Sequence, residues 1–189
     1  MTTTAAIIAG TGASLAGIGT VAWTNPGNIT ASDDTRATTN VGVASVSNWL
    51  VATNFDFSTI PNDAVILGVT GTFEGSYITS PVTLTSASFV VGGAVVGTAK
   101  TLSQALTSSD ASYTVGSASD LWGYAITPAL LKVSTTGFAV SMTGGGAASV
   151  ARVDAMWLTV DYGYNGFRTR FTSSTLSNRL RRPLMSVRS

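Results

Sequence analysis

The chain has 189 residues, enough for one well-filled domain with additional arms but not for two full domains. It contains no Cys and no His, which excludes disulfides, thiolate metal sites and the commonest general base of enzymes. Only 10% of its residues are charged, where soluble proteins average about 25%, so we expect much of its surface to be covered in an assembly.

Residues 5–22 are uncharged and about as long as a membrane span. However, Gly, Thr and Ser dilute this stretch, and no Lys or Arg flanks it as a signal peptide or an oriented span requires. We therefore expect no membrane partner. We predict an N-terminal arm of small residues over 1–19, flexible and leading into a first strand at Thr20–Thr24.

Alternating apolar residues predict strands with one buried face along most of the chain. The clearest runs are Val65, Leu67, Val69 and Phe73, then Phe138, Val140 and Met142, then Val150, Met156, Leu158, Val160 and Tyr162. Further candidate strands are Asp34–Asn40, Ser47–Asn54, Val82–Val91 and Ala111–Val115. Glycine pairs and triplets at residues 92–93 and 144–146 predict tight turns.

Helical signals are confined to Thr127–Lys132, where Thr127 is a candidate N-cap and Pro128 fits the first helical position. About eight strands without helical crossovers predict an all-β fold, an antiparallel two-sheet sandwich of the jelly-roll type. We place this domain at residues 20–163, between the N-terminal arm and a basic C-terminal arm over residues 164–189.

The C-terminal arm holds six of the ten basic residues, and no acidic residue follows Asp161. The body is therefore near −5 and the arm near +6, which favours contact with an acidic neighbour or a second copy. Apolar residues four apart favour a short helix over residues 174–181, too short to be stable alone in water. The candidate protein-interaction residues are Phe167, Arg168, Arg170, Phe171, Leu176, Arg179, Leu180, Arg181, Arg182 and Leu184.

Two groups of acidic residues are candidates for chemistry. Asp33 and Asp34 would need further ligands, such as Asp110, to bind Ca²⁺, so we favour capping of backbone N–H groups or pairing with an arginine. Arg152 and Asp154 share the parity of the apolar residues in their run, which predicts that both are buried and held by structural hydrogen bonds. No serine-nucleophile motif or phosphate loop occurs, so we predict no catalytic, metal-binding or cofactor-binding residues and no enzyme.

Aromatic residues could form a sugar-binding platform, although in a sandwich they are more often core or interface residues. They are Trp23, Trp49, Trp122 and Trp157, with Tyr77, Tyr113 and Tyr124.

The order of short motifs over residues 21–162 resembles a family of tailed-bacteriophage virion proteins, whose members are described as structural or minor structural proteins. The motifs that carry the resemblance are Trp23–Asn28, Ala31–Ala37, Trp49-Leu50, Asn54–Phe57, Ile60-Pro61, Ala64–Val69, Asp120–Gly123, Thr127–Ala129 and Ala151–Val160. The resemblance implies a β-sandwich component of the virion and brings no catalytic residue with it. Neither arm is covered by the match.

Together these observations predict a virion structural protein, a capsid decoration or cement subunit that stabilises the shell through its arms. The expected partners are the major capsid protein and further copies of the chain in a homotrimer, rather than nucleic acid. Two alternatives remain open: a neck, tail or fibre component of the particle, and a carbohydrate-binding module that recognises the host surface.

Overall fold

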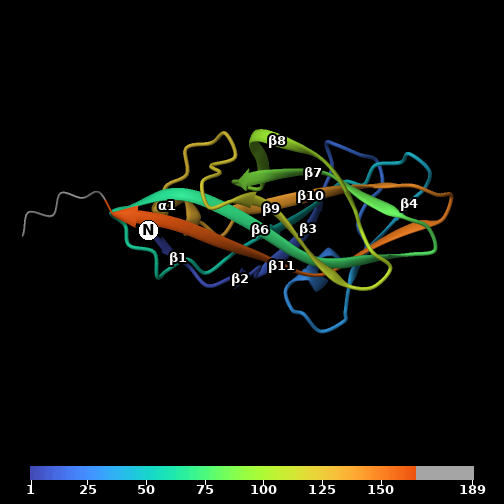
Figure 1. Ribbon diagram of the computed structural model, residues 1–189, viewed down its shortest axis with the longest axis horizontal. Coiled ribbons are helices and arrows are strands. Elements are labelled where there is room, and N and C mark those ends of the chain that lie inside the picture. Colours follow the sequence, from blue (N-terminus) through green and yellow to red (C-terminus); the bar gives the residue numbers. More distant parts are fainter. Residues whose placement is uncertain (165–189) are drawn as a thin grey trace, which may run out of the picture.

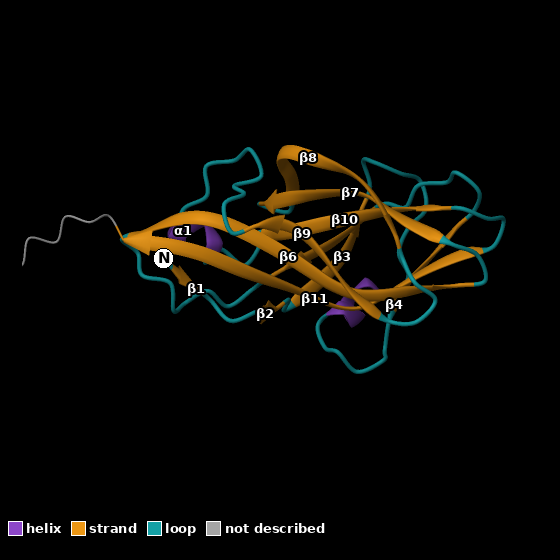
Figure 2. Ribbon diagram, viewed as in Figure 1, coloured by secondary structure: helices purple, strands orange, loops and turns teal. Residues whose placement is uncertain are grey.

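The computed structural model describes residues 1–164, which form two antiparallel β-sheets packed face to face (Figure 1). The first, sheet A, contains β1 (Thr2–Thr3), β2 (Ile7–Ile8), β4 (Ala37–Val41), β6 (Ala64–Ile78), β9 (Ala111–Ser117) and β11 (Ser149–Tyr164). The second, sheet B, contains β3 (Thr11–Leu15), β5 (Trp49–Thr53), β7 (Val82–Val91), β8 (Ala94–Ala105) and β10 (Gly137–Gly144). Between residues 1 and 164 the only helices are single turns, η1 (Pro26–Ile29) and α1 (Pro128–Leu131) (Figure 2). The predicted all-β, two-sheet sandwich is confirmed.

The strand order is that of a jelly roll. Among the eight strands from β4 onward, the first pairs with the last and the pairing continues inward: β4 with β11, β5 with β10, β6 with β9, and β7 with β8. Nested pairing of this kind results when one long antiparallel hairpin is rolled into two facing sheets. The sheets consequently read β4–β11–β6–β9 and β5–β10–β7–β8.

The N-terminal residues belong to both sheets, so the flexible arm predicted over residues 1–19 is wrong. β1, β2 and β4 pair with successive parts of the same edge of β11, and β3 pairs with β5 at the edge of sheet B. Backbone N–H groups of Thr4 and Ala9 donate to β11, to the carbonyl oxygens of Val160 at 3.0 Å and Met156 at 2.9 Å. The segment thus covers edges that would otherwise expose unpaired backbone groups.

The strand predicted at Thr20–Thr24 is not formed as a continuous element. Val21 and Thr24 make isolated bridges, to Ser47 and Thr38. The chain here crosses from β3, at the edge of sheet B, toward β4 in sheet A, and it forms only single bridges on the way.

The core lies between the two sheets and is built from apolar side chains of both. Phe138, Val140 and Met142 of β10 are fully buried, as their alternation predicts. Phe73 and Met156 of sheet A belong to the same cluster. Each buried side chain of this size contributes about 1.5–3 kcal/mol of transfer free energy.

A bulge in β6 moves two predicted core residues to the outside. Leu67 has no partner in the register between β6 and β11, so the faces of β6 exchange at this point. Ile66 is buried, whereas Val65 and Leu67 are 38% and 37% exposed. The prediction that they share the buried face of Val69 and Phe73 is therefore wrong for Val65 and Leu67.

A loop that carries Trp122 connects the two sheets. The buried indole Nε1 of Trp122 donates to the carbonyl oxygen of Val69 in sheet A at 2.8 Å. Its own carbonyl oxygen accepts from the backbone N–H of Thr98 in β8 at 2.9 Å. Farther along, the Thr127 side chain accepts from the backbone N–H of Leu130, which confirms Thr127 as the N-cap of α1.

Candidate functional site

The ten interaction residues predicted from the sequence, Phe167 to Leu184, lie outside the described residues, and their role stays a prediction. The described chain ends at Tyr164, the last residue of β11. The structure therefore shows the surface from which the C-terminal arm departs.

That surface exposes two large apolar side chains, Val65 and Leu67, on the outer face of sheet A, which we call the β11-end patch. Val65 lies opposite Gly163 in the register of β6 and β11, and Tyr164 lies opposite Ala64. Because Gly163 has no side chain, nothing from β11 covers Val65 or Leu67 there. Tyr164 is 57% exposed but lies on the other face of the sheet, with the buried Ala64. The patch arises from the bulge at Leu67, which sequence alternation alone does not reveal. Apolar residues grouped at one end of a sandwich are suited to contact with another protein.

A second feature, on the outer face of sheet A, is a network of arginine and carboxylate side chains. Arg36 contacts Asp34 at 2.5 Å and also pairs with Asp110. Asp110 accepts from the Ser76 hydroxyl at 2.6 Å, and Arg152 Nη2 donates to the same hydroxyl oxygen at 2.8 Å. Burial raises the pKa of Asp110, but the hydrogen bonds from Ser76 and Arg36 outweigh it and bring that pKa below its usual value.

The neighbouring acids Asp33 and Asp34 make local contacts beside this network. Asp33 Oδ1 accepts from the backbone N–H of Thr35 at 2.9 Å, while Asp34 pairs with Arg36. Both predicted roles, capping and arginine pairing, are confirmed. A guanidinium occupies the position between Asp34 and Asp110 where a Ca²⁺ ion would need to lie, and residues 1–164 contain no group of three or more His, Cys, Asp or Glu residues placed to hold a metal.

Asp154 lies at a bulge in β11 and is 2% exposed. Burial raises its pKa and nearby Glu74 adds to the rise, while backbone N–H groups of Asp34 and Asp33 oppose it. Its Oδ1 atom has no hydrogen-bond partner. The predicted burial of Asp154 is therefore confirmed, but its Oδ1 atom lacks the structural hydrogen bond that was predicted for this side chain.

The same bulge corrects the predicted orientation of Arg152. Ala151 and Val153 belong to the core, so Arg152 between them points to the outer face, where it reaches Ser76. The prediction placed it on the inward face with Met156, but the residue inserted at Asp154 exchanges the two faces of β11.

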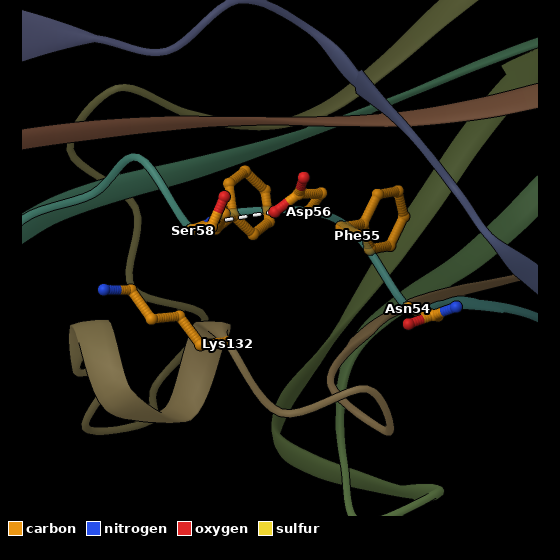
Figure 3. Close-up of a pocket in the computed structure, with 6 residues that line it drawn as sticks. Asn54, Phe55, Asp56, Ser58 and Lys132 are labelled. Atoms are coloured by element: carbon orange, nitrogen blue, oxygen red, sulfur yellow. Dashed lines mark hydrogen bonds between the residues drawn. The ribbon is translucent and has the colours of Figure 1, made fainter.

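A pocket of about 330 Å³ lies between the chain after β5 and the end of α1 (Figure 3). Asp56 accepts from the backbone N–H of Ser58 at 3.0 Å, and hydrogen bonds from the side chain and backbone of Ser58 lower its pKa. Lys132 Nζ donates to Asn62 Oδ1 at 2.7 Å. The rings of Phe55 and Phe57 are buried, so they present no open face to a ligand. The lining residues are Asn54, Phe55, Asp56, Phe57, Ser58 and Lys132.

The aromatic residues considered as a sugar platform are mostly in the interior. Trp23, Trp49 and Trp122 are buried, as is Tyr113. Trp23 Nε1 donates to the carbonyl oxygen of Asn48 at 2.9 Å, which fixes its ring inside the fold. These rings therefore act in packing, the role that sequence reasoning favoured.

No helix within residues 1–164 is long and apolar enough to cross a membrane. Comparison of the chain with protein-family models, with curated proteins and with solved structures finds no match.

Proposed function

We propose that this chain is a structural protein of a bacteriophage particle, a capsid decoration or cement subunit. The support consists of the motif order over residues 21–162, the jelly-roll strand order, and a surface with few charged residues. The proposal involves no catalysis, and it places the protein in the virion.

The observation that carries the proposal is that the acidic residues lie in the folded body, whereas most basic residues follow it, next to an exposed apolar surface. All nine acidic residues lie at or before Asp161, and six of the ten basic residues follow it. The β11-end patch of Val65 and Leu67 lies beside the end of β11, where the basic, apolar C-terminal arm begins. An apolar surface continued by a cationic segment fits a protein partner whose surface combines apolar grooves with acidic groups, and we take this partner to be the major capsid protein.

The mechanism is stabilisation by mass action. A subunit that binds only the assembled shell lowers the free energy of that state and not of its dissociated proteins. At a free concentration of about 100 times the dissociation constant, each site contributes about 2.7 kcal/mol. Many sites on one shell would then raise its resistance to heat and internal pressure.

The alternative, a neck, tail or fibre component of the particle, would use the same fold and C-terminal arm. It would differ from a shell protein in its copy number per particle. Quantitative gel staining of purified particles separates the two: hundreds of copies support a shell protein, whereas about a dozen or fewer support a neck or tail part. The carbohydrate-binding alternative has less support, because three of the four Trp side chains are buried and offer no ring face to a sugar.

Truncation after Tyr164 tests the proposal. The truncated protein should keep the melting temperature of the full chain and fail to join particles that lack the protein. The matched control is the full chain with Ala148→Asp, a substitution in the exposed loop between β10 and β11, which should be incorporated normally. Full incorporation of the truncated protein would refute the docking role of the C-terminal arm.

A further inference from the structure

The strands at the edges of the two sheets differ in how their free sides are covered. One edge of β11 is paired with β1, β2 and β4, and β4 is bridged in turn, because Thr24 and Thr38 exchange backbone hydrogen bonds at 2.8 and 3.1 Å. At the β8 edge of sheet B, the register with β7 shifts twice and Gly97 has a φ of 70°. There the backbone N–H of Thr98 donates to the carbonyl oxygen of Trp122. Bulges and covering loops of this kind keep an edge strand from pairing with another chain.

β9, at the end of sheet A beside β6, has no such protection (Figure 1). It pairs with β6 over its whole length, Ala111–Ser117, without a bulge. It contains no charged residue and no proline, and Ser112 and Thr114 are exposed. Within residues 1–164, β6 is the only strand paired with β9, and no backbone hydrogen bond joins Ser112 or Thr114 to a loop. The middle of β9 is therefore an open strand edge.

The direction of the backbone groups in β9 follows from their partners in β6. The N–H of Val69 donates to the carbonyl oxygen of Asp120, just beyond β9, so the backbone groups of Val69 face the β9 side. Backbone groups alternate in direction along a strand, so those of Phe73, four residues farther on, also face β9, where Tyr113 lies opposite. The two neighbours of Tyr113 therefore direct their N–H and carbonyl groups away from β6, toward the open side.

Those neighbours, Ser112 and Thr114, present two donors and two acceptors that are placed symmetrically about Tyr113. An antiparallel copy of this segment, related by a two-fold axis at Tyr113, sets Ser112 of each chain opposite Thr114 of the other. Each of the two opposed pairs exchanges two hydrogen bonds, and the small hydroxyl side chains meet on the outer face of sheet A. The Tyr113 side chain is 4% exposed and lies in the core, so it does not obstruct the axis.

Charge does not oppose a contact between two such edges. Glu74 lies opposite Ser112, one strand inside the edge. The Glu74 side chains of two paired copies would be three strand spacings apart, roughly 14 Å, which exceeds the screening length of about 8–10 Å in salt. Asp110, just before β9, is paired with Arg36, and the full chain has a net charge of only +1.

We propose that two copies of the chain pair through their β9 edges, related by a two-fold axis at Tyr113, so that the two A sheets form one continuous sheet. A contact between strand edges over residues 111–115 is smaller than the roughly 1,600 Å² of a standard interface, so the dimer should exchange reversibly with the monomer. One partner occupies the whole open edge. The pairing therefore closes at two copies, in place of the trimer predicted from the sequence.

Sedimentation of the purified full chain over a concentration series tests this proposal without reference to any particle. We expect the monomer mass of 19.3 kDa at low concentration and twice that mass at high concentration. Thr114→Lys and Ser112→Lys each place a charge at the edge, close to its own symmetry mate, and either should abolish the dimer. Thr159→Lys is the matched control, because it puts the same charge on the same face of sheet A but two strands inside the edge, on β11. It should dimerise like the wild type, and melting temperatures show whether each variant is folded.

Amide hydrogen exchange, measured residue by residue, locates the contact. The N–H groups of Ser112 and Thr114 should exchange quickly in the monomer and slowly at concentrations where the dimer forms. The N–H of Tyr113 faces β6, so it should be protected at every concentration and serves as the internal reference.

Four results would each overturn the proposal: a full chain that stays monomeric at every concentration, a trimer, a dimer unchanged by both edge lysines, or a dimer whose Ser112 and Thr114 N–H groups still exchange quickly. None of these results bears on docking of the C-terminal arm, which is tested by truncation.

Discussion

Asp154 is a buried acid with one unpaired oxygen, and such a group opposes folding when it is charged. Burial and Glu74 raise its pKa, so the folded protein favours the neutral form more than the unfolded chain does. The contribution of this group to stability is therefore fully present below its unfolded pKa of about 3.8 and is lost as pH rises through the folded pKa. Asp110 has a lowered pKa and acts in the opposite sense. Its contribution to stability is present above its unfolded pKa and is lost as pH falls through its folded pKa.

The variant Asp154→Asn removes the charge and keeps a side-chain oxygen that can accept from the backbone N–H groups of Asp33 and Asp34. We expect its free energy of unfolding to exceed that of the wild type at pH 7, with the difference shrinking as pH falls toward 3. Denaturant unfolding at a series of pH values measures this difference. Asp56→Asn is the control with the opposite expected trend, because hydrogen bonds from Ser58 lower the pKa of Asp56. If the stability of Asp154→Asn relative to the wild type fell as pH rises, this account of Asp154 would be contradicted.

At the scale of whole elements, the sequence predicted best the strands whose buried face is uninterrupted. Phe138, Val140 and Met142 alternate without a bulge, and all three are in the core. Prediction failed for β8, which lies at a sheet edge where most residues are exposed, so no alternation marks it. It failed again at the bulges near Leu67 and Asp154, because one inserted residue exchanges the faces of a strand without any local sequence signal.

Features of the candidate site could be predicted where they depend on contacts between residues close in sequence, and not where they depend on strand register. The roles of Asp33 and Asp34 could be predicted because they depend on contacts with residues two positions away. The β11-end patch could not be predicted, because it depends on the register between Val65 in β6 and Gly163 in β11, which are 98 positions apart in the chain. The uncharged outer face of sheet B likewise requires knowing which strands are neighbours.

The N-terminal strands give an element-scale prediction. Deleting residues 2–9 removes β1 and β2 and the hydrogen bonds that Thr4 and Ala9 make to β11. Three such bonds at about 0.5–1.5 kcal/mol each amount to roughly 1.5–4.5 kcal/mol, a large part of the stability of a typical domain. We expect a clear fall in melting temperature and a tendency to aggregate through the unpaired edge of β11.

Thermal unfolding and light scattering of the deletion variant measure both effects. Truncation after Tyr164 is the matched control, because it removes residues from the other end of the chain and should not change the melting temperature. An N-terminal deletion that melts like the full chain would mean that residues 2–9 do not hold the edge of β11.

At the scale of the whole molecule, the two outer faces of the sandwich differ in character. The outer face of sheet B is uncharged, whereas the outer face of sheet A carries the arginine–carboxylate network and, at its other end, the apolar β11-end patch. The sequence then adds a C-terminal arm near +6 beyond the patch. In the proposed function, the patch and the C-terminal arm beside it would together form one continuous docking surface.

Two variants of the C-terminal arm separate the apolar from the ionic part of docking. In the first, Phe167, Phe171 and Leu176 become Ser; in the second, Arg168, Arg170 and Arg179 become Gln. Three apolar side chains contribute up to about 4.5–9 kcal/mol when buried, against about 0.6–3 kcal/mol for three exposed ion pairs. We therefore expect the first variant to lose binding to particles at every salt concentration. The second should bind more slowly and lose the salt dependence of the wild type.

Sedimentation of particles mixed with each variant over a salt series measures the binding of both. If the arginine variant lost as much binding at low salt as the apolar variant, or lost more, charge rather than apolar contact would anchor the C-terminal arm.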